Sequence, residues 1–371
     1  QREKSLVVNA EGEIVDGERR GINHQWRRQR EKAHAMVGSR GRVQVLRYLR
    51  YCISNSTVDS MLRSRAALIS GRILSSSDAY AAVDISSVTA LLAATDERLK
   101  VLGGQNTDEY ESELEALGLI GSSKLAFLRV RQHYDYRFMS LRFLSSQGAA
   151  LLLSSSPVAR HVIESAFDRH SRGKQLAGLH ALASICGVDR PEDKMLLDNK
   201  AEENLRLLIY TAASNTSKLN PSVIGLTGSN SLGTTTGTRN KIGIFSHENV
   251  SLHCKLQGYR LISGLVVRPW CLMEICLNQE VVTIVTDAKI ETAKNGLFLS
   301  TKTIITFIQL CMDARHHCCT AISTTLSSSN LLQDAAVART AAKLQEAVRR
   351  GPYVTKGHVE AQPVVMTAER F

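Results

Sequence analysis

One pattern, an apolar helical stretch that ends in small residues, recurs along this chain and limits the folds open to it. Four clear copies and a weaker fifth are present, at residues 66–71, 115–121, 180–187, 259–265 and 321–322. Apolar residues within and around the copies follow the three- and four-residue spacing of a helix that buries one face. Units that recur in this way bury their apolar faces by stacking on their neighbours. The recurrence therefore predicts a row of packed helices.

Helical periodicity extends well beyond these copies. Val337, Ala341, Leu344 and Val348 lie on one helical face, and no segment alternates apolar and polar residues over more than a few positions. Aromatic residues, which strands favour, make up only 5% of the chain. We therefore expect an all-α fold, an armadillo/HEAT-like α-solenoid interrupted by irregular insertions.

The insertions are inferred from the spacing of the copies. Equivalent points are 49, 65, 80 and 60 residues apart, at Leu68, Leu117, Leu182, Ile262 and Ile322. Armadillo and HEAT units recur at about 40–47 residues, so only the first spacing is close. Three blocks with a different composition account for the excess: 125–146, 218–254 and 295–312. Removing about 22, 35 and 16 residues brings the longer spacings to about 43–45, within the range of such repeats.

The charge is concentrated near the amino end. Residues 17–50 contain ten Lys or Arg and two acids, which supplies +8 of the total +11 and leaves +3 for the other 337 residues. We divide the chain into a basic, poorly ordered leader (1–57), a helical repeat array (58–350) and an extended tail (351–371). A nucleic-acid-binding arm is the alternative interpretation of the leader. The array itself has no obvious basic groove, so nucleic acid is not the expected partner.

The cysteines and their neighbours give no metal site. His316, His317, Cys318 and Cys319, with Cys311 nearby, resemble a metal cluster, but adjacent ligands on a helix point in different directions and no second pair completes a site. The eight cysteines are unevenly spaced in apolar runs, and those at positions 271 and 276 are predicted to be core thiols. Buried reduced thiols favour a cytoplasmic or nuclear protein.

Other motifs in the sequence also do not indicate a catalytic site or a cofactor-binding site. The glycine-rich stretches 225–230 and 233–237 lack a preceding strand and a Gly-Lys-Ser/Thr sequence, so they are interpreted as flexible loops. No nucleophile elbow or zinc-protease helix is present. The remaining candidates are interpreted as surface, core or helix-start residues, with the last two also able to line a binding face: His161, His170, His180, Asp189, Glu192, Asp193, Glu202 and Glu203. We predict a protein that is not an enzyme, with no cofactor, small-molecule substrate, metal or membrane span.

Trp270 is the one large side chain for which two roles stay open. It follows Pro269 at a predicted helix start, among apolar neighbours. It can be an exposed anchor for a partner or a buried plug between helices, and we expect burial.

Several stretches resemble the family of 26S proteasome non-ATPase regulatory subunit 5, its plant members in particular. They are residues 147–157, 173–182, 190–193, 259–265, 268–270, 346–353 and 366–371. The resemblance spans about residues 58–371 without the three blocks, and family members are longer at the amino end. It implies an armadillo/HEAT-like assembly chaperone of the proteasome regulatory particle, which binds the C-terminal domain of a base ATPase subunit. The contacting residues are not indicated.

Overall fold

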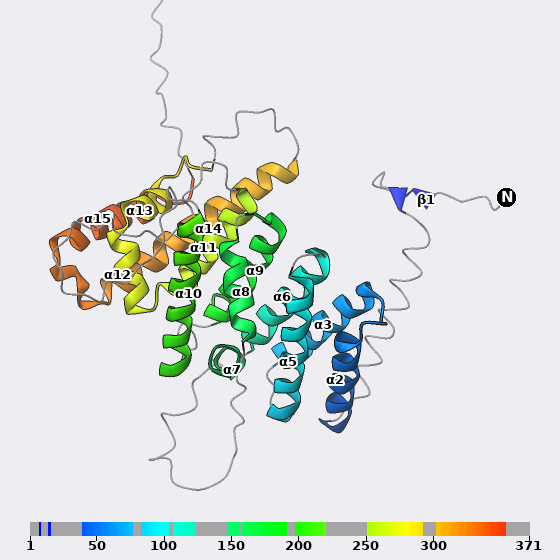
Figure 1. Cartoon of the computed structure of the whole chain (residues 1–371). Helices are drawn as coiled ribbons and strands as arrows, with labels where there is room; N and C mark the ends of the chain where they lie inside the picture. The colour runs from blue at the N-terminus through cyan, green and yellow to red at the C-terminus, as the bar shows by residue number, and fades with distance from the viewer. Residues whose placement is uncertain are drawn as a thin grey trace, which may run out of the picture.

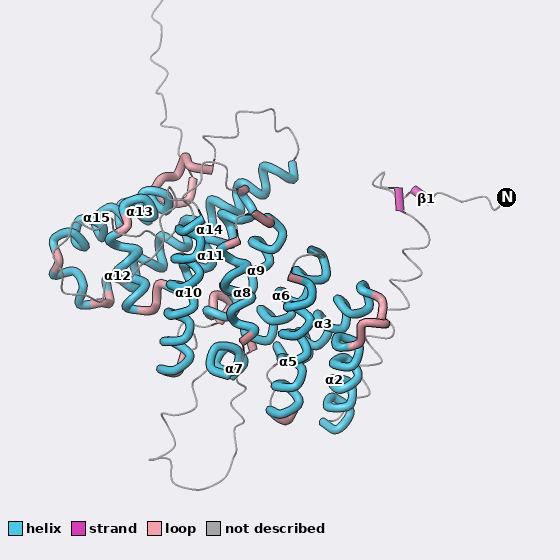
Figure 2. The backbone as a smooth tube through the Cα atoms, in the orientation of Figure 1, coloured by secondary structure: helices cyan, strands magenta, loops and turns pink. Residues whose placement is uncertain are grey.

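The structure, a computed structural model, is helical throughout almost all of its described part (Figure 2). It describes residues 7–8, 14–15, 39–76, 83–103, 107–123, 147–155, 157–168, 170–190, 197–219, 251–291 and 302–353. The exception is a short antiparallel pair, β1 (Val7–Val8) with β2 (Ile14–Val15). The predicted all-α class is confirmed for this part of the chain.

A row of five helices runs through the molecule, and each member packs against the next. In order they are α3 (Ser60–Ser75), α6 (Thr107–Gly121), α9 (Arg172–Cys186), α11 (Leu252–Leu265) and α14 (Lys302–Ser327). Each of these helices holds one copy of the recurring pattern, although the third copy runs one residue past the end of its helix. Segments that resemble one another in sequence therefore lie on helices that pack one against the next.

Glycines explain why the copies end in small residues. A Cβ atom on Gly71 of α3 would lie 2.8 Å from the carbonyl oxygen of Ala116 in α6. One on Gly118 of α6 would lie 2.7 Å from the Cα of Ala181 in α9. A side chain at either position would force the helices apart, because interiors are close-packed. Small residues thus allow neighbouring backbones of the row to approach closely.

The other helices flank this row (Figure 1). Toward the amino end, α2 (Ser39–Ser54) packs on α3 and on α5 (Ile85–Leu102), and α5 contacts α8 (Val158–Phe167). In the middle, α10 (Asn199–Leu219) packs on α8 and on α7 (Gln147–Ser155). Toward the carboxyl end, α12 (Pro269–Leu277), α13 (Gln279–Thr286), a short 3-10 helix η2 (Asn330–Gln333) and α15 (Ala335–Arg350) surround α14.

One continuous apolar cluster extends from Leu46 in α2 to Ala347 in α15. The described helices therefore share a single core rather than forming separate domains. None of these helices combines the length and the apolar composition needed to span a bilayer.

Two predicted boundaries are wrong. Residues 39–54 fall within the predicted leader 1–57, yet they form α2 and bury Leu46, Leu49 and Ile53. Arginines lie between these apolar residues in the sequence, so the apolar face of the helix was not recognised. The predicted irregular block 295–312 becomes helical at Lys302, where α14 begins. Packing of Cys311 against α11 overrides the β-branched composition of that stretch.

The other predicted boundaries fall partly outside the described residues. α10 ends at Leu219 and α11 begins at Leu252, so the predicted block 218–254 overlaps helix by a few residues at each end. Residues 125–146 and 220–250 lie outside the described part, as do residues 354–371 of the predicted tail.

Candidate functional site

A cluster of aromatic and charged side chains lies where α10 meets α12, and we call it the α10–α12 cluster: Glu202, Arg206, Tyr210, Trp270 and Glu274. Asp198 accepts a hydrogen bond of 2.8 Å from the backbone N–H of Ala201 and so supports the start of α10. Leu205 and Ile209 of α10 are buried in the core. The cluster residues of α10 recur every fourth position and therefore share a neighbouring face of the helix.

Trp270 is neither the fully buried plug nor the exposed anchor that the sequence left open. It is partly buried and packs against the core, in the first turn of α12 after Pro269. Its indole Nε1–H donates to Oε1 of Glu202 over 2.8 Å. Arg268, which is 1% exposed, has its Nε 3.0 Å from the same oxygen. One carboxylate of α10 therefore holds two side chains at the start of α12.

The tyrosine of the cluster connects the same two helices. Tyr210 lies 6.0 Å from the Trp270 ring, centroid to centroid, and its hydroxyl donates to Oε1 of Glu274. Arg206 lies 5.6 Å from the centre of the Tyr210 ring, within the range of a cation–π contact. Burial, together with the Glu274 carboxylate, raises the pKa of Tyr210 to about 12. The phenol therefore stays protonated and acts as a donor at neutral pH.

α10 also exposes a leucine. Leu207, next to Arg206 on α10, is 59% exposed. Trp, Tyr and Arg are the residues that most often dominate the energetics of protein–protein interfaces. The carboxylates of the cluster, Glu202 and Glu274, already pair with Arg268, Trp270 and Tyr210.

The side chains of the histidine–cysteine run of α14 (316–319) and of Cys311 do not face one common metal site. His316 Nε2 lies 3.2 Å from the carbonyl oxygen of Val348, Cys319 contacts the carbonyl of Leu344, and Cys311 contacts that of Leu252. Among the described residues, no group of three or more His, Cys, Asp or Glu is arranged to hold a metal ion.

The prediction of buried thiols is confirmed. All eight cysteines are buried and free of disulfides, including the predicted core thiols Cys271 and Cys276. Burial raises the pKa of Cys186 and that of Cys276 to about 11 each. Such thiols carry almost no nucleophilic thiolate at neutral pH.

The three singled-out histidines have different surroundings. His161 Nε2 is 3.1 Å from Asp96, His180 Nδ1 is 3.1 Å from Arg260, and His170 is exposed. Asp189 pairs with Arg260 over 2.8 Å and so joins α11 to the end of α9. Of the remaining predicted residues, Glu203 lies 3.7 Å from Arg206. Glu192, Asp193 and both glycine-rich stretches are outside the described residues.

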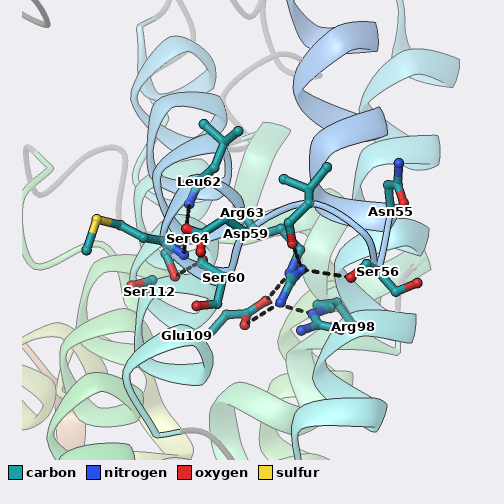
Figure 3. A network of polar contacts seen from close by, with 12 residues as sticks. Asn55, Ser56, Asp59, Ser60, Leu62, Arg63, Ser64, Arg98, Glu109 and Ser112 are labelled. Atoms are coloured by element: carbon teal, nitrogen blue, oxygen red, sulfur yellow. Dashed lines mark hydrogen bonds and ion pairs between the residues drawn. The ribbon is translucent and has the colours of Figure 1, made fainter.

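Sequence analysis missed a buried ionic network between α3, α5 and α6 (Figure 3). Arg63 donates to both oxygens of Glu109, from Nε over 2.7 Å and from Nη2 over 3.1 Å, while Arg98 donates to the same carboxylate over 2.7 Å. Arg63 also donates to the backbone carbonyl of Val58 and so holds the α2–α3 turn. Partners 46 residues apart leave no local signal in the sequence.

A second carboxyl, one turn along α6, lies beside this network. Glu113 is fully buried, and its pKa is raised to about 8, first by burial and then by the nearby charge of Glu109. Thr95, Arg98 and Arg63 lower that pKa and offset only part of the rise. Both carboxyl oxygens of Glu113 are buried, so we expect this residue to affect the stability of the fold rather than to react.

Comparison with known proteins does not assign a function. No family model matches this chain, and no match to it is found among curated proteins or solved structures. Function is therefore inferred from the arrangement of the described residues and from the sequence itself.

Proposed function

We propose that this chain is a non-enzymatic protein-binding scaffold built as an armadillo/HEAT-like α-solenoid. The observation that carries the proposal is the row α3, α6, α9, α11 and α14, in which each helix holds one copy of the recurring pattern and packs on the next. Stacked helices of this kind form extended surfaces that bind other proteins.

The proposed partner is the C-terminal domain of an ATPase subunit of the 26S proteasome base, and the proposed role is that of an assembly chaperone. The sequence resemblance to regulatory subunit 5 supports this choice, because the resembling residues 173–182 and 259–265 belong to neighbouring helices, α9 and α11. Holding one ATPase domain would block premature contacts until the correct neighbours arrive. Such a role belongs in the cytoplasm or nucleus.

Gly351, Pro352 and Tyr353, the last three residues of the resembling stretch 346–353, give further support. Gly351 follows α15 with a φ of 80°, a conformation that glycine adopts readily. Pro352 then accepts a hydrogen bond of 2.8 Å from Nη2 of Arg315, and the Tyr353 hydroxyl donates to Asp313 over 2.8 Å. These residues thus tie the end of α15 to α14, the last helix of the row.

We assign partner binding to the α10–α12 cluster together with Leu207. Trp, Tyr and Arg are the residues most enriched at interface hot spots, where truncation costs about 2 kcal/mol or more, and Leu207 adds exposed apolar area on the same helix. Glu202 keeps Trp270 in place, so little side-chain freedom is lost on binding.

The test is a binding assay between the purified full chain and each base ATPase C-terminal domain. We expect one domain to bind and Leu207→Ala to weaken that binding about tenfold, as the loss of about 1.4 kcal/mol of apolar burial requires. Val101→Ala is the matched control, because Val101 is a comparably exposed apolar residue on α5, at 69%. A folded chain that retains none of the ATPase domains would overturn the proposed function. Equal losses from both substitutions would overturn the assignment to the cluster.

A further inference from the structure

The outer face of α2 exposes two tyrosines one turn apart. Tyr48 is 63% exposed and Tyr51 is 58% exposed, although the opposite face of the helix is buried against α3 and α5. In contrast, Tyr110 and Tyr259 are buried. Exposed aromatic rings at this spacing lie about 4.5 Å apart along the helix axis, close to the separation of successive stacked bases.

The charge on this helix has one sign. Residues 39–54 include four arginines and no acidic residue. Two of these arginines, Arg47 and Arg50, are exposed and stand directly before Tyr48 and Tyr51. Asp84 is an acid near this face, and the charge of Arg47 contributes to lowering its pKa. That carboxylate also accepts hydrogen bonds from Ser86 and Ser87 at the start of α5.

We propose that the outer face of α2 binds single-stranded nucleic acid. Unpaired bases stack on Tyr48 and Tyr51, and the phosphates between them contact Arg47 and Arg50. Aromatic stacking contributes about 1–3 kcal/mol per base and is tolerant of sequence, while the guanidinium groups follow the backbone. A duplex hides its base faces, so the two tyrosines favour single strands.

This inference does not depend on the proposed function. α2 is the first of the described helices, whereas the α10–α12 cluster lies on later helices that flank the row further along (Figure 1). Nucleic acid and a protein partner would therefore occupy different surfaces. Loss of one activity would leave the other intact.

The experiment measures fluorescence anisotropy of labelled 20-nucleotide RNA, the matching DNA strand and the corresponding DNA duplex with the full chain. We expect both single strands to bind more tightly than the duplex, and affinity to fall with salt by a slope of about 0.7 per phosphate contact. A double substitution, Tyr48→Ala with Tyr51→Ala, should weaken single-strand binding at least tenfold. Tyr48→Phe with Tyr51→Phe should retain it, because phenylalanine also stacks.

Arginine variants test whether binding requires this face of α2 or only positive charge anywhere on the surface. Arg47→Ala with Arg50→Ala should reduce the salt slope by about 1.4, as expected for two phosphate contacts. Arg349→Ala with Arg350→Ala on α15 removes the same charge from another exposed site and should change nothing. The proposal is overturned if the wild-type chain binds no single strand in 50 mM salt. It is also overturned if the alanine pair at Tyr48 and Tyr51 binds as tightly as wild type. Equal losses of single-strand affinity from the two double arginine variants would overturn it as well.

Discussion

The buried carboxyl of Glu113 should make the stability of this protein fall as pH rises. Its pKa is 4.5 in its ordinary environment and about 8 in the folded chain. Between these values the folded state holds a proton that the unfolded state has released, so unfolding becomes easier with increasing pH. The destabilisation is absent below pH 4.5 and complete above pH 8. Replacing Glu113 with glutamine, which has a similar shape and no charge, should remove this dependence.

The magnitude follows from the two pKa values. One pH unit corresponds to about 1.4 kcal/mol, so the stability advantage of Glu113→Gln over wild type should grow by about 3 kcal/mol between pH 5.5 and 7.5. Urea denaturation followed by circular dichroism at both pH values measures this difference. Glu115→Gln is the matched control, because Glu115 lies two residues away on the exposed face of α6. If the advantage of Glu113→Gln were the same at both pH values, the reasoning would be refuted.

Three further predictions concern packing, the ionic network and the thiols. Gly118→Ala places a methyl group 2.7 Å from a backbone atom of α9 and should cost about 1–3 kcal/mol in urea denaturation, while Gly103→Ala, with no neighbour nearer than 3.5 Å, should be neutral. Arg63→Met removes one partner of a buried carboxylate and should cost about 3–5 kcal/mol, whereas Arg349→Met, whose side chain is 78% exposed and pairs with the exposed Glu346, should cost less than about 1 kcal/mol; similar losses would argue against the network. Iodoacetamide at pH 8 should label none of the eight cysteines until urea is added, because they are buried and the pKa of Cys186, for example, is about 11; labelling of the native chain would contradict this.

Properties that recur along the chain could be predicted from the sequence. The pattern at 66–71, 115–121, 180–187 and 259–265 identified the helices of the row, because a stacked helix needs both an apolar face and small residues where the next backbone approaches. The buried cysteines were also predictable, since several of them, such as Cys186, Cys271 and Cys276, lie within apolar stretches. In these cases the neighbours along the chain already determine the environment.

The tertiary structure decided what depends on partners far apart in sequence. The sequence alone suggested a poorly ordered leader through residue 57, but α3 and α5 offer an apolar surface on which α2 folds. Trp270 is held halfway between core and solvent because Glu202, 68 residues earlier, accepts its N–H. Glu113 has a raised pKa because folding removes water from its carboxyl group and leaves the charge of Glu109 close by, while Thr95 and Arg63, brought in from other helices, offset only part of the rise. Helical periodicity specifies which face of a helix is apolar, whereas the energy of a buried charge is set by groups that only the complete fold brings together.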